Sequence, residues 1–171
     1  TRLRLKQAYG RLIRRADDFA GFKLHPRAQG FSMQHVYEHL KVAGTLDKPV
    51  LIHTDAFADR AHPREIIDAA ETHPGTTVIA AHNMQGFYYH APHTVLDRIM
   101  DLQNLLVETS LHCTPAGIET LVEDLGADRI LFGSDYPYGH PVPMQKNVTL
   151  ADIDTSDAEA IAHGNAADLF W

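Results

Sequence analysis

The chain has 171 residues, of which 44% are hydrophobic and 22% charged, the composition of an ordinary soluble globular domain. We therefore predict a single domain over residues 1–171. Its 15 basic and 22 acidic residues give a formal net charge of −7, so we expect no nucleic-acid partner. No apolar stretch reaches the ~18 residues of a membrane span. The single cysteine, Cys113, excludes an internal disulfide and suits a reducing, cytoplasmic compartment.

Helical patterns recur along the chain, each with its own start or stop signal. Proline suits the first helical position, glycine often follows the last one, and Ser-x-x-Glu is a capping-box pattern. On these signals we expect helices at about 4–19, from Ser32 to Gly44, over 64–71 after Pro63, after Pro92, from Thr114 to Gly126, and after Ser156 and Glu159.

Five short apolar runs lie between these helical patterns, and they end at His25, His53, His82, Ser110 and Asp135. The runs are continuously apolar, as in strands that are covered on both faces. Regular strand–helix alternation then implies parallel strands. The sheet could be open and doubly wound, or part of a closed barrel.

The strand ends decide between these two architectures. A doubly wound nucleotide binder normally has a glycine-rich turn after its first strand, and no such turn occurs here. Histidines and an aspartate occupy those positions instead. We therefore predict an α/β fold of the (β/α)₈ TIM-barrel type with only about five of its eight strands in this chain.

Three side chains form the central candidate site, namely His53, His82 and Asp135. Each follows an apolar strand, so all three should meet at one rim of the sheet. Imidazole and carboxylate groups together suit Zn²⁺ or a similar divalent ion, which would activate a bound water molecule. Asp135 could both bind the metal and accept the proton of that water.

Two further positions could face the same pocket. Lys23 and His25 lie two apart on one strand and so share a face, where Lys23 could bind a substrate carboxylate, pair with Asp135 or be purely structural. At the end of the run before Asp135, parity allows either Glu108 and Ser110, or else Thr109, to face the pocket. The loop residues His90, His93 and His112 could contact substrate or could simply be solvated.

A rival metal motif lies on the second predicted helix. His35-Val36-Tyr37-Glu38-His39 matches H-x-x-E-H, the inverted zinc-peptidase pattern. This helix connects two strands, so the face that carries the motif should lie on the outer surface of a barrel.

The chain resembles the amidohydrolase superfamily, and more narrowly the branch that includes aminocarboxymuconate-semialdehyde decarboxylase-like enzymes. The resemblance rests on the segments GFKLHP (21–26), PVLIHT (49–54), AHN (81–83), ILFGSDYP (130–137) and GNAADLF (164–170). It implies that Lys23 and His25 lie on strand 4, and we predict that both bind substrate. It also implies that His53 on strand 5 and Asp135 on strand 8 bind metal, that Asp135 accepts a proton, and that His82 on strand 6 is an acid/base or a second-metal ligand.

The family pattern also includes an H-x-H pair on strand 1, which this sequence lacks. We therefore expect a C-terminal portion of a longer enzyme, which is completed either by an N-terminal segment or by a partner chain, such as a second copy in a homo-oligomer.

The function predicted first is that of a metal-dependent hydrolase, in which metal-activated water attacks a carbonyl or lactone carbon of a small organic substrate. The alternatives are a non-oxidative decarboxylase or hydratase of the same branch, a non-catalytic barrel fragment, and the helix-borne zinc peptidase.

Overall fold

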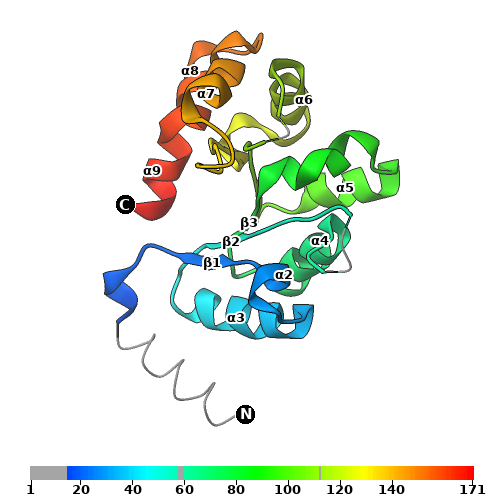
Figure 1. Ribbon diagram of the computed structural model, residues 1–171, viewed down its shortest axis with the longest axis vertical. Coiled ribbons are helices and arrows are strands. Elements are labelled where there is room, and N and C mark those ends of the chain that lie inside the picture. Colours follow the sequence, from blue (N-terminus) through cyan, green and yellow to red (C-terminus); the bar gives the residue numbers. More distant parts are fainter. Residues whose placement is uncertain (1–14, 58–59, 112) are drawn as a thin grey trace.

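The computed structural model describes residues 15–57, 60–111 and 113–171. Its centre is a five-stranded sheet, in which every pair of neighbouring strands is parallel (Figure 1). The strands are β1 (Phe22–Leu24), β2 (Val50–Ile52), β3 (Val78–Ala80), β4 (Leu105–Glu108) and β5 (Ile130–Leu131).

The spatial order of the strands is their order in the sequence, β1 to β5. A doubly wound sheet reverses its strand order at a switch point, whereas a (β/α)₈ barrel adds each strand beside the previous one. The order therefore confirms the barrel-type architecture over the doubly wound alternative. The described residues contain five strands of such a barrel.

The register separates the two faces of the sheet. Lys23 lies beside Leu51, and the same row continues through Ile79 to Leu106. The next residue of each strand lies instead in the hydrophobic core, as Leu24, Ile52, Ala80 and Val107. Because successive strand residues point to opposite faces, the row of Lys23 is on the concave face, which would line the interior of a barrel.

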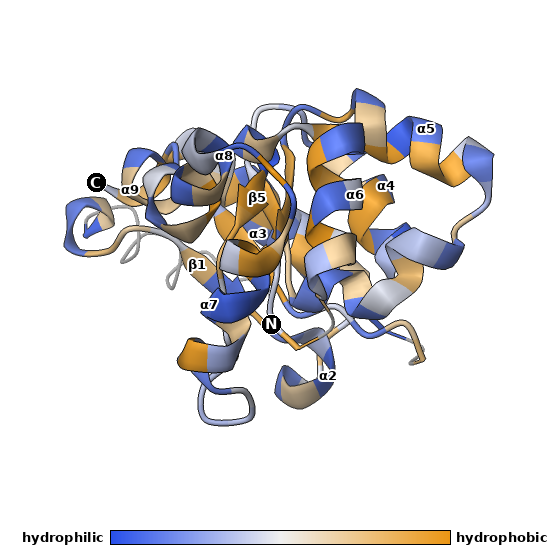
Figure 2. Ribbon diagram, turned by 90° about the horizontal axis from the view of Figure 1, so that it is seen from above, coloured by the Kyte–Doolittle hydropathy of each residue, from blue (hydrophilic) through white to orange (hydrophobic). Residues whose placement is uncertain are grey.

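Helices that carry buried apolar residues cover the opposite, convex face of the sheet. Their apolar sides turn toward the strands and their polar sides toward solvent (Figure 2). They are α3 (Met33–Thr45), α4 (Pro63–Thr72), α5 (His93–Asp101) and α6 (Pro115–Leu125).

Shorter elements complete the chain. They are the 3₁₀ segments η1 (Ala16–Asp18), η2 (His82–His90) and η3 (Ala127–Arg129), the π-helical segment η4 (Ala160–Gly164), and the helices α2 (Pro26–Gln29), α7 (Pro141–Leu150), α8 (Thr155–Glu159) and α9 (Asn165–Phe170). The helix predicted at 4–19 lies largely outside the described residues. No described helix has both the length and the apolar character needed to cross a bilayer.

Two of the predicted helix starts are confirmed in detail. Pro63 is the first residue of α4, and His62 and Glu65 form a reciprocal capping box before it. The side chain of Thr114 accepts a hydrogen bond from the Gly117 amide at the start of α6. Pro92 is displaced by one position, because it is the cap of α5 and not its first residue.

Two predicted boundary signals are wrong. Gly44 lies inside α3, where a Cβ atom would come 2.5 Å from Thr76 Oγ1, so close packing and not helix termination requires the glycine. The expected capping box of Ser156 is absent, because α8 begins at Thr155 with Asp154 as its cap.

Candidate active site

Three imidazoles meet at the carboxyl ends of the first three strands. His53 Nδ1 lies 3.0 Å from His82 Nε2, within hydrogen-bonding distance. On the other side of His53, the ring of His25 stacks with a centroid distance of 3.6 Å and an angle of 15° between the planes. The prediction that His53 and His82 converge is therefore confirmed, and His25 joins them.

An unusual backbone turn holds His82 in place. His82 has a φ of 62°, and the following residues, Asn83, Met84, Gln85 and Gly86, have φ values of 47°, 50°, 53° and 75°. Left-handed backbone costs a non-glycine residue roughly 1–2 kcal/mol, so tertiary contacts must stabilise this turn. Asn83 and Met84 are fully buried, and the Asn83 side-chain amide donates to the Tyr89 hydroxyl at 2.7 Å.

Residues at the end of β4 hold the ring of His82 in place through hydrogen bonds. Ser110 Oγ lies 2.7 Å from His82 Nδ1, and the same hydroxyl donates to Glu108 Oε2 at 2.8 Å. The Glu108 carboxylate also accepts from the backbone amides of Ser110 and His82, both at 2.9 Å. Thr109 points elsewhere and accepts from the Gly133 amide. Of the two arrangements that parity allowed, the structure has Glu108 and Ser110 facing the site.

Gly133 makes room for this carboxylate. A Cβ atom at residue 133 would overlap the side chain of Glu108. The glycine of the FGSDYP segment thus leaves the space that Glu108 fills. In this way Glu108, at the end of β4, packs against the residue that follows β5.

Asp135 follows β5 in a left-handed conformation, with a φ of 53°. Its carbonyl oxygen accepts from the amides of Tyr138 and Gly139, which closes a tight turn. Its negative charge raises the pKa of Lys23 and of His25, against the larger lowering effect of burial, so it lies within electrostatic reach of both. Within the described ranges, no hydrogen bond or ion pair joins the Asp135 side chain to His53 or His82.

Burial and crowding favour neutral groups in this cluster. The pKa of His53 is lowered to about 4, chiefly by burial and then by the nearby His25, His82 and Lys23. Burial, followed by the positive charge of Lys23, also lowers the pKa of His25. The residue Lys23 is exposed on the concave face, yet partial burial of its ammonium group lowers its pKa, while Glu108 and Asp135 oppose that shift.

A pocket of about 550 Å³ opens beside the imidazoles, and it is lined by His25, Arg27, Ala28, His53, Asp55 and Gln85. Arg27 Nη1 forms an ion pair with Asp55 Oδ2 at 2.8 Å, and Gln85 Oε1 accepts from the Ala56 amide. Sequence reasoning missed Arg27, Asp55 and Gln85. Each lies two or three residues after one of the three histidines, and this spacing was the signal that could have revealed them.

The donor atoms fit part of a metal site. Neutral imidazole at His53 and carboxylate at Asp135 are suitable ligands for a divalent ion. However, the described residues contain no group of three or more His, Cys, Asp or Glu side chains placed to hold a metal. The roles predicted for His53, His82 and Asp135 therefore stay predictions, as do those of Lys23 and His25.

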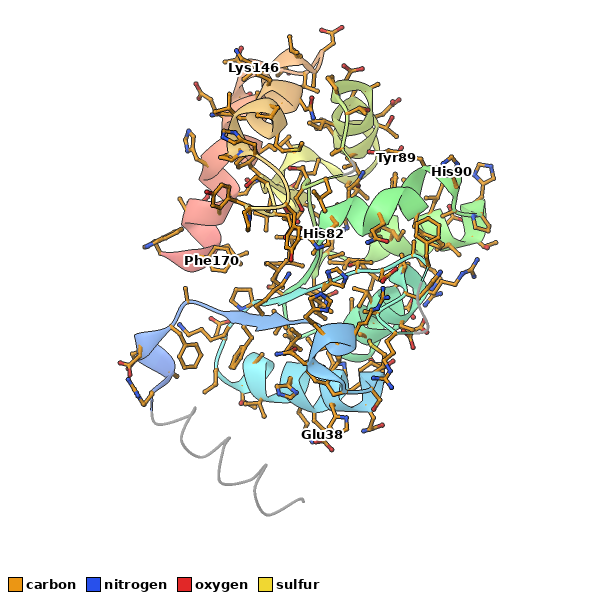
Figure 3. The ribbon with its side chains drawn as sticks, viewed as in Figure 1. Glu38, His82, Tyr89, His90, Lys146 and Phe170 are labelled. Carbon is orange, nitrogen blue, oxygen red and sulfur yellow. The ribbon has the colours of Figure 1, made fainter. Side chains whose placement is uncertain are left out.

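The other candidate histidines lie apart from this cluster. His39 Nδ1 bonds to the His35 carbonyl within α3, and Glu38 lies on the outer side of that helix, far from His82 (Figure 3). The H-x-x-E-H motif therefore faces outward, as expected. His90 and His93 are exposed, and His112 lies outside the described residues.

Comparison with known proteins identifies the family. The amidohydrolase family model matches residues 3–170, and the chain belongs to this family. No curated protein matches the sequence.

Solved structures share the fold at low sequence identity. A dihydroxybenzoic acid decarboxylase from Polaromonas sp. JS666, with bound manganese, is 20% identical with a TM-score of 0.60 over 78% of this chain and 53% of its own. A manganese complex of 5-carboxyvanillate decarboxylase from Novosphingobium aromaticivorans is 16% identical, with a TM-score of 0.69 over 95% and 60%. The IDCase of Metarhizium anisopliae is 15% identical, with a TM-score of 0.70 over 97% and 61%. The chain thus spans little more than half the length of these proteins.

Proposed function

We propose that this chain forms the catalytic C-terminal part of a metal-dependent enzyme that removes the carboxyl group of a small organic acid without oxidation. The observation that carries the proposal is the stack of His25 on His53, bonded to His82, beside a pocket that contains Arg27. The pocket thus combines a cation that suits a carboxylate with imidazoles that suit a metal. Two of the compared structures are named as decarboxylases, which favours this reaction over hydrolysis.

The reaction makes a specific demand on the protein. The bond between the substrate carbon and its carboxyl group breaks, the electron pair stays on that carbon, and CO₂ leaves. A proton must then reach the same carbon. We assign the delivery of this proton to Asp135, whose carboxylate would first take it up from a water molecule, because Asp135 is partly exposed and close to His25 and Lys23.

His82 would act through its neighbour. It is 3% exposed, and its two ring nitrogens lie within hydrogen-bonding distance of His53 and Ser110. It does not line the pocket, whereas His53 and His25 do. His53 is therefore the imidazole that would face the substrate or the metal, and His82 would hold it in place.

A divalent ion is part of the proposal. His53 and Asp135 would supply two of its ligands, and the ion would stabilise negative charge on the bound substrate. The ligand types suit zinc, and manganese is the ion in two of the compared structures. We further propose that another segment or a partner chain completes the barrel and the metal shell.

The proposal is tested by supplying the purified protein with Mn²⁺ or Zn²⁺ and a panel of hydroxybenzoates, lactones and amides. We expect CO₂ release from a carboxylic acid, and a loss of at least a hundredfold in turnover in Asp135→Asn. The exposed Asp101→Asn is the matched control and should retain activity. Cleavage of lactones or amides without CO₂ release would instead establish the hydrolase.

A further inference from the structure

A hydrogen-bonded chain of four side chains runs from Glu108 through Ser110 and His82 to His53. Its links are 2.8 Å from Ser110 Oγ to Glu108 Oε2, 2.7 Å from His82 Nδ1 to Ser110 Oγ, and 3.0 Å from His53 Nδ1 to His82 Nε2. We propose that Glu108 and Ser110 are positioning residues, which determine the ring nitrogen that carries the proton in His82 and in His53.

The direction of the chain is set at Glu108. Two backbone amides, those of Ser110 and His82, donate to its carboxylate, and each can only donate. A carboxylate can only accept, and both of its oxygens do so here. The hydrogen of the Ser110 hydroxyl is therefore directed to Glu108 Oε2.

The donor and acceptor of each remaining hydrogen bond, from Ser110 to His82 and from His82 to His53, follow from this direction. Because the Ser110 hydroxyl donates its hydrogen to Glu108, its oxygen must accept from His82. The proton of His82 is therefore on Nδ1. The Nε2 atom of a neutral His82 then carries a lone pair. It accepts from His53 Nδ1, which must carry the proton of that ring.

The consequence falls on the remaining nitrogen of His53. With its proton on Nδ1, Nε2 of His53 has a free lone pair, as a metal ligand or a base requires. The stacked ring of His25 packs against His53 and restrains its rotation. The reverse order would present an N–H group at Nε2 of His53, which cannot bind a cation.

Long-range ¹H–¹⁵N NMR of the histidine rings tests the inference, on the whole chain at neutral pH and without metal or substrate. We expect His82 and His53 both to be protonated at Nδ1 in the wild type. Ser110→Ala should reduce the Nδ1-protonated fraction of both rings. Thr109→Val, which removes the neighbouring buried hydroxyl, should leave both spectra unchanged.

Three results would overturn the inference: a wild-type His53 protonated at Nε2, a doubly protonated His82, or unchanged tautomers in Ser110→Ala. The wild-type spectrum decides the first two even if the variant does not fold. The catalytic role of these four hydrogen-bonded side chains rests on the proposed function, but the predicted tautomers of His53 and His82 do not. A failure of one is therefore distinguishable from a failure of the other, because these spectra require no turnover.

Discussion

The imidazole of His25 lies flat against that of His53, with the ring centroids 3.6 Å apart. His25 is fixed from its other side, because its Nδ1 accepts a hydrogen bond from the Ala28 amide as the cap of α2. Two rings at this distance cannot both carry a positive charge without strong repulsion. Protonation of both rings would therefore destabilise the stack.

Stability should accordingly fall on mild acidification. The pKa of His53 is about 4 in the folded chain and 6.5 in its ordinary state, so the unfolded state takes up the proton first as the pH falls. The contribution of neutral His53 to the free energy of unfolding is complete above pH 6.5 and is lost between about pH 6.5 and 4. We expect a loss on the order of 1–2 kcal/mol in the free energy of unfolding, after allowing for solvent screening of this partly exposed ring.

Urea denaturation across this pH range measures the effect, with His53→Gln as the test and the exposed His90→Gln as the control. The slope of stability against pH should flatten only in His53→Gln. An equal slope in His53→Gln and wild type would show that the histidine stack does not cause the acid sensitivity.

Gly133→Ala should destabilise the end of β5. The new methyl group would overlap Glu108, whose carboxylate bonds to the amides of His82 and Ser110, so these bonds must distort. Overpacking of this kind typically costs about 1–3 kcal/mol. Thermal and chemical denaturation would measure it. Gly75→Ala is the matched control, because a Cβ atom there meets nothing within 4 Å, and it should change stability by less than about 1 kcal/mol.

The fold was largely predictable because its signals are local. Apolar runs of strand length, the prolines at helix starts and the spacing of strand ends lie in contiguous segments. Gly44 misled the prediction because the contact that requires a glycine comes from Thr76, which is distant in sequence. A single sequence does not distinguish a glycine that ends a helix from one that admits a neighbour.

The candidate site was predictable only in outline. The histidines at the strand ends were found, because parallel strands bring their carboxyl ends together. The choice of Glu108 and Ser110 over Thr109 depends on the pleat of β4, which the sequence leaves open by one residue. The left-handed turn that begins at His82 contains four non-glycine residues in this conformation, and tertiary contacts such as the burial of Asn83 and Met84 stabilise it.

Arg129 should contribute far more to the stability of the fold than Arg98 does. It is 4% exposed and donates to the carbonyls of Ile99, Met100 and Leu102 at the end of α5. Arg129→Ala leaves these carbonyls without that donor and should cost about 3 kcal/mol. Arg98→Ala removes ion pairs with Asp68 and Glu71 on the surface, which should cost no more than about 1 kcal/mol. Similar losses in the two variants, measured by chemical denaturation, would contradict this assignment.

Arg27 should bind the substrate carboxylate at the pocket. Its side chain is 68% exposed although it pairs with Asp55, whose own side chain is 8% exposed. Burial alone would raise the pKa of Asp55, but the Phe57 amide and Arg27 outweigh it, so the carboxylate stays ionised and orients the guanidinium. The remaining donors of Arg27 can therefore contact an anion without breaking the pair.

Arg27→Gln should raise KM about tenfold, which corresponds to ~1.4 kcal/mol of binding, and should change kcat little. If Arg27 instead had a purely structural role, loss of its ion pair with Asp55 would lower kcat and thermal stability, and KM would stay constant. Arg64→Gln is the matched control, since Arg64 lies on α4 over the ring of Phe87 and does not line the pocket. Steady-state kinetics on the acid that releases CO₂ would separate the two roles, because only substrate contact by Arg27 predicts a change confined to KM.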